Sequence, residues 1–176
     1  MRRLSRLVSD LLELSSLQSN PAAFESEAVD AQALLYDMMD LTAPLAQKKG
    51  LALALEAPEH LPFVRCNEDR LQQVLTILMD NAVKFTAEGT VTLGAEPVRG
   101  GVRFFVRDTG VGMDAFTCAH AFDRFHQADR SRRTGGSGLG LAIAQEIMTR
   151  MGTAITVDST PNEGSTFSFT LPRDEE

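Results

Sequence analysis

The stretch Gly135-Gly136-Ser137-Gly138-Leu139-Gly140-Leu141-Ala142-Ile143 joins a polar, arginine-bearing loop to an apolar segment. Glycines let the backbone approach a ligand closely, and the first N–H groups of a helix have no partner inside it, so such a junction suits a phosphate group. A flexible hinge before an ordinary core helix would have the same pattern, and both interpretations stay open at this point. Helical spacing of the apolar residues that follow predicts the helix itself: Leu139, Ile143, Ile147, Met148 and Met151.

The composition is that of a soluble globular protein. Hydrophobic residues make up 43% and charged residues 23% of the 176 residues, and no apolar run approaches the ~20 residues that span a bilayer. The two cysteines, Cys66 and Cys118, lack metal-ligand spacing, which favours free thiols in a reducing compartment. A net charge of −7 argues against nucleic acid as a partner. We therefore expect a cytoplasmic domain, and a membrane anchor elsewhere in the full-length protein stays open.

An amphipathic helix is predicted over residues 1–19. Its leucines, widened by Val8 and Leu12, need a partner, so the helix either docks on the rest of the chain or forms half of a helical hairpin or bundle. Asn20-Pro21 ends it, because proline disfavours helical conformation in the residue before it. The stripe consists of Leu4, Leu7, Leu11, Leu14 and Leu17.

The remaining pattern predicts a two-layer α/β sandwich, a mixed sheet with helices on one face. Helices are expected at 27–48 and 68–85, and a strand at 51–56. Hairpins are expected to pair 90–95 with 102–107 and 154–158 with 166–171. The buried side of the 27–48 helix is expected to consist of Leu34, Leu35, Met38, Leu41 and Leu45.

Two groups of polar residues could carry chemistry. Asp108 opens Asp108-Thr109-Gly110-Val111-Gly112 after a predicted strand, where a tight turn would leave its carboxylate facing a cavity, able to accept from an exocyclic amine. Asn81 and Lys84 share a helix face, and an amide oxygen suits Mg²⁺ while a lysine ammonium suits phosphate. A strand-ending turn and a solvated pair are the plainer alternatives.

Arginines gather between the two glycine motifs of this acidic chain. The polar segment that carries them could close over a phosphate as a lid, or could be a solvated basic loop. The arginines are Arg124, Arg130, Arg132 and Arg133.

The order of these motifs resembles the ATP-binding domain of the sensor histidine kinases, over almost the whole chain. Asp69 to Leu75 and Asp80 to Thr86 are similar to the family's asparagine box. Asp108 to Gly112 is similar to its first glycine box, Phe122 to Phe125 to its phenylalanine box, and Gly136 to Gly140 to its second glycine box. Leu4 to Leu17 resembles the second helix of the family's dimerisation and phosphoacceptor domain.

The resemblance implies the Bergerat-type fold, with ATP and Mg²⁺ bound between the helices on the sheet and a lid. It implies that Asp108 recognises the adenine amine, that Asn81 is the metal ligand, and that Asn81 and Lys84 are catalytic. The cofactor-binding residues that it implies are Asn81, Lys84, Asp108, Gly110, Gly112, Phe122, Phe125, Arg130, Arg132, Arg133, Gly136, Ser137, Gly138, Leu139 and Gly140.

Two features depart from the family pattern. Ile77 stands where the family often has a second asparagine and where related ATPases have a glutamate base, so we expect slow ATP hydrolysis. The family's phosphoacceptor histidine lies on a first hairpin helix, and His60, His120 and His126 have no matching context. We therefore expect residues 1–20 to be a partial dimerisation domain, 21–26 a linker and 27–173 the catalytic domain.

The expected function is that of a bacterial two-component signalling enzyme. The chain would transfer the ATP γ-phosphate to a histidine on a dimerisation domain of the same kinase, absent from this chain, for phosphorelay to a response regulator. A homodimer through residues 4–17 is a further expectation. A serine-phosphorylating kinase of the same superfamily and a non-catalytic nucleotide-binding adaptor are the alternatives.

Overall fold

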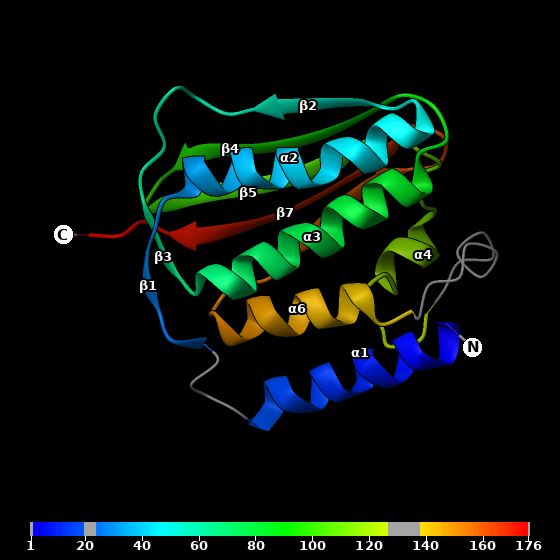
Figure 1. Ribbon diagram of the computed structural model, residues 1–176, viewed down its shortest axis with the longest axis horizontal. Coiled ribbons are helices and arrows are strands. Elements are labelled where there is room, and N and C mark those ends of the chain that lie inside the picture. Colours follow the sequence, from blue (N-terminus) through cyan, green and yellow to red (C-terminus); the bar gives the residue numbers. More distant parts are fainter. Residues whose placement is uncertain (1, 20–23, 127–137, 176) are drawn as a thin grey trace.

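The computed structural model describes residues 2–19, 24–126 and 138–175. Along it, helices are separated by one or two strands in most places, and Figure 1 shows the helices gathered on one side of the main sheet. The helices are α1 (Arg2–Ser19), α2 (Ala31–Lys49), α3 (Glu68–Phe85), α4 (Ala115–Ala119) and α6 (Gly140–Arg150). The strands are β1 (Glu27–Val29), β2 (Ala52–Glu56), β3 (Val64–Cys66), β4 (Thr90–Val98), β5 (Gly101–Asp108), β6 (Thr156–Thr160) and β7 (Gly164–Pro172).

The main sheet is mixed, with the strand order β2-β4-β5-β7-β6. β2 runs parallel to β4, and the other neighbouring pairs are antiparallel. Alternate residues of each strand face the helices, so the core consists of one row from each strand and the apolar faces of α2, α3 and α6. This is the predicted two-layer α/β sandwich. Its central strand β5 ends at Asp108, beside Val91 of β4 and Ser165 of β7.

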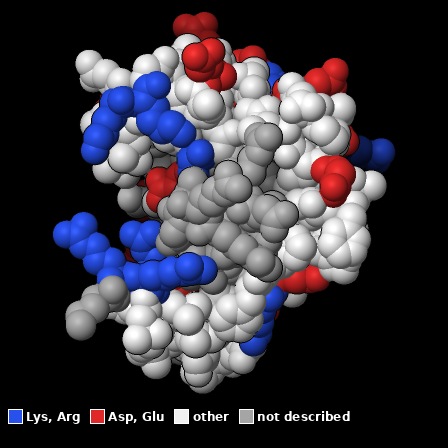
Figure 2. Space-filling view, turned by 90° about the vertical axis from the view of Figure 1, so that its right-hand side faces the viewer, with Lys and Arg blue, Asp and Glu red and all other residues white. Residues whose placement is uncertain are grey.

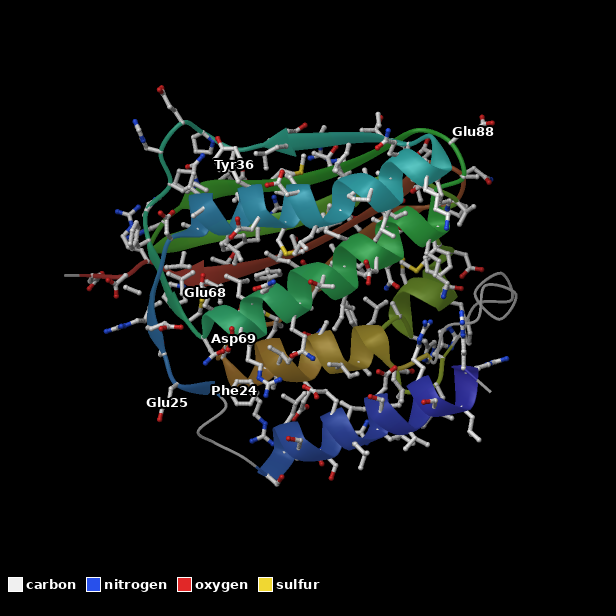
Figure 3. The ribbon with its side chains drawn as sticks, in the orientation of Figure 1. Phe24, Glu25, Tyr36, Glu68, Asp69 and Glu88 are labelled. Carbon is white, nitrogen blue, oxygen red and sulfur yellow. The ribbon has the colours of Figure 1, made fainter. Side chains whose placement is uncertain are left out.

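α3 occupies the predicted range because its local signals agree. The side chain of Asn67 accepts a hydrogen bond from the Arg70 N–H at 3.0 Å, which caps the helix. Glu68 and Asp69 follow in the first turn, where negative charge complements the helix dipole (Figure 3). The apolar face that the spacing predicted is buried except at Phe85, which is half-buried: Leu71, Val74, Leu75, Leu78 and Ala82.

The prediction for the 27–48 segment is wrong at its start and for two residues of its buried face, whereas Leu34, Leu35 and Met38 are buried as predicted. The helix begins at Ala31, because Asp30 caps it by accepting from the Ala33 N–H at 3.1 Å. Residues 27–29 are the strand β1 instead and pair with β3, which was not predicted either. Leu41 and Leu45 are exposed, because the buried row steps by four residues from Leu34: Met38, Thr42 and Ala46.

The two predicted hairpins are present as β4–β5 and β6–β7, and the predicted 51–56 strand is β2. Gly50 ends α2 in the left-handed conformation, with φ at 72°. The five-residue helix α4 was not predicted, because its short sequence shows no complete turn of apolar spacing.

α1 docks on the rest of the chain, beside α6 (Figure 1). Leu14 and Leu17 are buried in the common core, and Leu7 packs against it. The rest of the predicted stripe is not covered, since Leu4 is 68% exposed and Leu11 40% exposed. Docking therefore uses one half of the apolar surface of this helix.

Candidate functional site

Two adjoining cavities lie between α3, α6 and the segments that follow β5. The Asp108 cavity, of about 550 Å³, includes Asp108, Met113, Phe116 and Asn162 in its lining. The Lys84 cavity, of about 880 Å³, includes Lys84, Asp80, Gly138 and Gly140 together with polar residues of α1. Both cavities are lined by the same five residues where they meet: Asn81, Phe85, Ala121, His126 and Leu141.

Asp108 is a buried carboxylate at the end of the central strand. Its side chain accepts a hydrogen bond from the Gly110 N–H at 2.9 Å, and the residue is 7% exposed. Burial raises the pKa of Asp108, and the backbone N–H donors of Gly110 and Ser165 lower it in part. A carboxylate held in this way can still accept from a ligand amine, because it has two oxygens and several lone pairs.

Close backbone packing explains the glycines of the first motif. A Cβ atom on Gly110 would overlap the carbonyl oxygen of Phe85, at the end of α3. Gly112 has a φ of 64°, and a Cβ atom there would overlap the carbonyl oxygen of Thr160. These glycines therefore let the loop after Asp108 lie against α3 and β6, which closes one side of the Asp108 cavity.

Asn81 and Lys84 lie on the face of α3 that borders the cavities. Asn81 lines both of them, whereas Lys84 lines only the Lys84 cavity. The Lys84 ammonium lies 5.2 Å from the centre of the Phe85 ring. Burial lowers the pKa of Lys84, and the nearby Arg6 guanidinium lowers it further. The predicted pair therefore lies where the Asp108 cavity meets the Lys84 cavity.

The second glycine motif borders the Lys84 cavity through Gly138 and Gly140. Gly138 has a φ of 77°, and its carbonyl oxygen accepts from the Phe125 N–H at 3.0 Å. Gly140 begins α6, and the side chain of Leu139 before it is fully buried in the core. The first turn of α6, with N–H groups that no helix carbonyl can satisfy, thus faces the same cavity as Lys84.

Five of the predicted site residues lie outside the described residues: Arg130, Arg132, Arg133, Gly136 and Ser137. The two aromatic residues of the third motif are described, and neither lines either cavity within the described part of the chain. Phe122 packs edge-on against Phe167 at 6.1 Å, and Phe125 is 54% exposed with a φ of 63°. Their contact with a nucleotide stays a prediction.

Sequence reasoning did not foresee the residues that α1 and His126 contribute. Arg6, Ser9, Asp10 and Glu13 form one wall of the Lys84 cavity, and His126 lines both cavities. The spacing of three, one and three between the α1 residues is a polar stripe beside the leucines, and this signal was present in the sequence. The Nε2 atom of His126 is buried and has no hydrogen-bond partner among the described residues.

A divalent cation would have few protein ligands here. No group of three or more His, Cys, Asp or Glu side chains suited to a metal occurs within residues 2–19, 24–126 and 138–175. The Asn81 amide borders both cavities. Asp80 next to it is an exposed residue, and desolvation of its carboxyl by the surrounding protein raises its pKa while Arg6 lowers it in part. One amide oxygen fits Mg²⁺, which commonly keeps waters and binds phosphate oxygens besides one or two protein ligands.

Comparison with known proteins identifies the family. The profile of the histidine kinase-, DNA gyrase B-, and HSP90-like ATPases matches residues 66–175. The chain is 35% identical to the sensor protein GacS of Pseudomonas syringae pv. syringae, over 97% of this chain and 20% of that protein. It is also 35% identical to the signal transduction histidine-protein kinase BarA of Escherichia coli K12, over 96% of this chain and 19% of that protein.

A solved structure agrees with these relatives. Full-length ShkA in complex with AMPPNP superimposes with a TM-score of 0.85 at 35% identity, over 97% of this chain and 36% of that one. The chain therefore belongs to the histidine kinase-, DNA gyrase B- and HSP90-like ATPase family. It is an ATP-binding domain similar to those of sensor histidine kinases, which confirms the resemblance seen in the sequence.

The chain spans about a fifth of the length of the GacS and BarA relatives. None of its described helices combines the length and the hydropathy that a membrane crossing requires.

Proposed function

We propose that this chain is the catalytic part of a sensor histidine kinase and transfers the γ-phosphate of ATP to a histidine of a dimerisation domain. The observation that carries the proposal is the meeting of two cavities at Asn81, with a buried carboxylate in one and a lysine in the other. A nucleotide with its base at Asp108 would extend past Asn81 and bring its phosphates to Lys84. In this proposal residues 1–20 belong to the dimerisation domain, 21–26 are a linker and 27–173 are catalytic.

Each residue has a role in this proposal. The Asp108 carboxylate accepts from the exocyclic amine of adenine, which orients the base. Lys84 and the first turn of α6 offset the charge of the phosphate oxygens, and positioning with charge neutralisation is most of what phosphoryl transfer requires. The bond from the γ-phosphorus to the bridging oxygen breaks, a bond to the histidine nitrogen forms, and ADP leaves.

Mg²⁺ belongs to the same proposal, with Asn81 as its one protein ligand. When bound, Mg²⁺ supplies charge neutralisation to the phosphate oxygens. Calorimetry of ADP binding with Mg²⁺ and with a chelator tests this without any turnover. The Asn81→Ala variant is expected to bind ADP with the same affinity in Mg²⁺ and in the chelator. The Gln47→Ala variant, which removes an exposed amide on α2, is the control and is expected to retain the difference in affinity between the two conditions.

The three histidines of the chain do not suit the acceptor role. His60 is exposed between β2 and β3, while the ring of His120 lies 2.6 Å from the Asp123 carboxylate. His126 has its Nε2 atom buried. In-line transfer tolerates little misplacement, so the chain alone is expected not to phosphorylate itself. Ile77 packs against the core with no group that could activate water, which favours slow ATP hydrolysis.

The test uses γ-labelled ATP with Mg²⁺, first with the chain alone and then with a separately made dimerisation domain that carries its histidine. We expect acid-labile, base-stable label on the added domain only. Label mapped to His60, His120 or His126 would contradict the proposal. Label on a serine of a protein partner would favour the serine kinase, and label on neither protein would favour the adaptor.

Two partners follow from the proposal, a response regulator and a second copy of the chain. The second copy would use the uncovered half of α1, where Leu4 and Leu12 are 68% and 66% exposed. Analytical ultracentrifugation measures whether the chain forms this dimer. A dimer that the Leu12→Glu variant dissociates supports the contact, and a monomer at all concentrations rules it out.

A further inference from the structure

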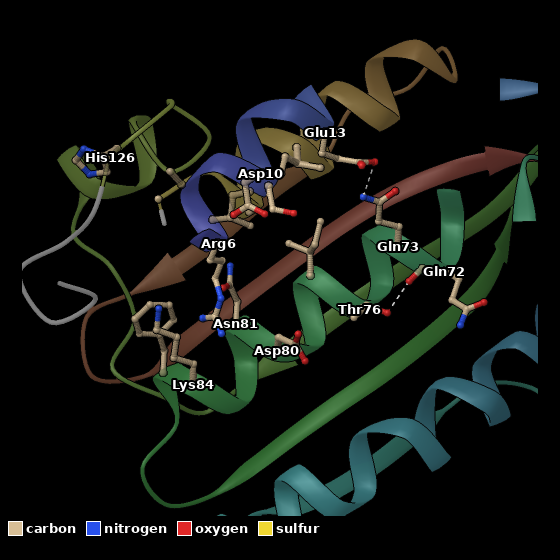
Figure 4. A pocket seen from close by; sticks show the side chains of 18 of the residues that line it. Arg6, Asp10, Glu13, Gln72, Gln73, Thr76, Asp80, Asn81, Lys84 and His126 are labelled. Atoms are coloured by element: carbon tan, nitrogen blue, oxygen red, sulfur yellow. Dashed lines mark hydrogen bonds between the residues drawn. The ribbon is translucent and has the colours of Figure 1, made fainter. Parts of the chain in front are cut away.

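α1 supplies one wall of the Lys84 cavity, and Arg6 is its basic residue there. Figure 4 shows the Arg6 side chain extending from α1 toward Asn81 on α3, with Lys84 one turn further along α3. Asn81 lines both cavities, whereas Arg6 lines only the Lys84 cavity. A triphosphate whose base lies at Asp108 would therefore pass Asn81 before it reaches Arg6. The residue thus borders the end of the site that is most distant from Asp108.

The position of Arg6 follows from the way in which α1 is held. Leu14 and Leu17 are buried in the core, and Glu13 accepts from the Arg70 guanidinium at 2.7 Å and from the Gln73 amide at 3.2 Å. Arg6 precedes Glu13 by seven residues, which is close to two helical turns, so both side chains leave the same face of α1. The contacts of Glu13 with α3 therefore turn Arg6 toward α3 as well.

The Lys84 cavity has cationic groups on opposite walls. The positive charge of Arg6 contributes to the lowered pKa of Lys84, after burial, so the two cations repel each other across the cavity. Among the described residues, none forms a hydrogen bond or an ion pair with the Arg6 guanidinium. Basic side chains also gather on the end face of the molecule where α1 begins (Figure 2).

We propose that Arg6 binds the terminal phosphate of a bound nucleoside triphosphate, from the wall opposite Lys84. The inference rests on the proposed nucleotide site and adds to it a phosphate-binding residue from α1. A guanidinium offers paired N–H donors in a planar fork that matches two phosphate oxygens, and an anion between Arg6 and Lys84 removes their repulsion. A diphosphate would end before Arg6, so the residue distinguishes triphosphate from diphosphate.

The docking of α1 and the binding of a triphosphate are thermodynamically linked. If docked α1 strengthens the binding of a triphosphate, then a triphosphate stabilises the docked position of α1 by the same factor. The helix would respond to whether the nucleotide still has its γ-phosphate.

The experiment compares two nucleotides by calorimetry, AMPPNP with Mg²⁺ and ADP with Mg²⁺. For Arg6→Ala and Arg6→Gln we expect the affinity for AMPPNP to fall about five- to tenfold, which is less than a buried charge-assisted hydrogen bond would give because Arg6 is solvent-exposed. The affinity for ADP should change by less than about twofold. Arg3→Ala is the matched control, since it removes the same charge from an exposed position on α1 outside the cavity.

Three results would overturn the inference. Equal losses of affinity for both nucleotides would show that Arg6 acts either by stabilising the fold or by long-range electrostatic attraction. Thermal unfolding of the nucleotide-free variants distinguishes the two, because only the first lowers the stability of the protein. Unchanged AMPPNP affinity would remove Arg6 from the site, and an equal loss in Arg3→Ala would reduce the effect to net charge. If the unaltered chain binds neither nucleotide, the proposed function itself fails, a result distinct from these three.

Discussion

Glu13 and Arg70 are 57 residues apart in the sequence, and their carboxylate oxygen and guanidinium nitrogen lie 2.7 Å apart. The contact joins α1 to the first turn of α3, next to the buried Leu14 and Leu17. The Arg70 guanidinium also stacks over the Phe24 ring, 5.5 Å from its centre. α1 is therefore held by polar and apolar contacts together, and its removal would expose both kinds of group.

The docking of α1 predicts a difference between two leucines on that helix. Leu17 is 1% exposed and Leu12 66% exposed. Leu17→Ala is expected to lower the free energy of unfolding by about 2–5 kcal/mol, because it leaves a cavity in the core. Leu12→Ala is the control and is expected to change it by less than about 0.5 kcal/mol. Urea unfolding measures both variants, and equal effects would mean that α1 is not part of the folded core.

Asp108→Asn is expected to weaken the binding of ATP by about ten- to a hundredfold, because it replaces a charge-assisted hydrogen bond of ~1.5–3 kcal/mol. Calorimetry measures the affinity. Asp158→Asn makes the same charge change at an exposed position on β6 and should leave the affinity unaltered. Unchanged affinity in Asp108→Asn would remove Asp108 from the site.

The pKa of Asp108 predicts how stability depends on pH. Burial raises that pKa above its ordinary value of 3.8, so the folded state favours the protonated acid. The contribution of the acid to stability is complete below 3.8 and is lost as the pH rises through the raised pKa. The free energy of unfolding, relative to that of Asp108→Asn, should therefore fall as the pH rises above 3.8 and through the raised pKa. Urea unfolding at several pH values measures it, and a difference that does not vary with pH would contradict the burial argument.

Two glycines with positive φ predict different costs of adding a methyl group. Gly152 has a φ of 81° with open space around it, so Gly152→Ala should cost about 1–2 kcal/mol, the cost of the left-handed conformation alone. Gly112→Ala should cost about 2–5 kcal/mol, because overlap with the Thr160 carbonyl adds an overpacking term. Thermal unfolding compares the two variants. If the order is reversed, the loop after Asp108 does not pack as described.

Agreement between sequence and structure is best where local signals are complete. α3 has a cap, an acidic first turn and more than four turns of apolar spacing, and its predicted range is confirmed. α2 has one leucine more than α3, yet the prediction wrongly placed Leu41 and Leu45 in the core. Which of two adjacent apolar rows is buried depends on the side chains of the sheet against which the helix packs, and the sequence of the helix does not contain that information. β1 and β3, with three residues each, are too short for an alternating pattern to identify.

The sequence by itself determined the fold class, the order of the motifs and the family resemblance, because these depend on residues close together in the chain. Tertiary structure alone decided that Asn81 stands between two cavities, that the loop after Asp108 packs on Phe85 and Thr160, and that α1 borders the Lys84 cavity. The physical reason is that contacts between distant segments depend on how whole faces pack. The polar stripe of α1 could be read from its spacing, but its partner on α3 is specified only when Leu14 and Leu17 enter the core.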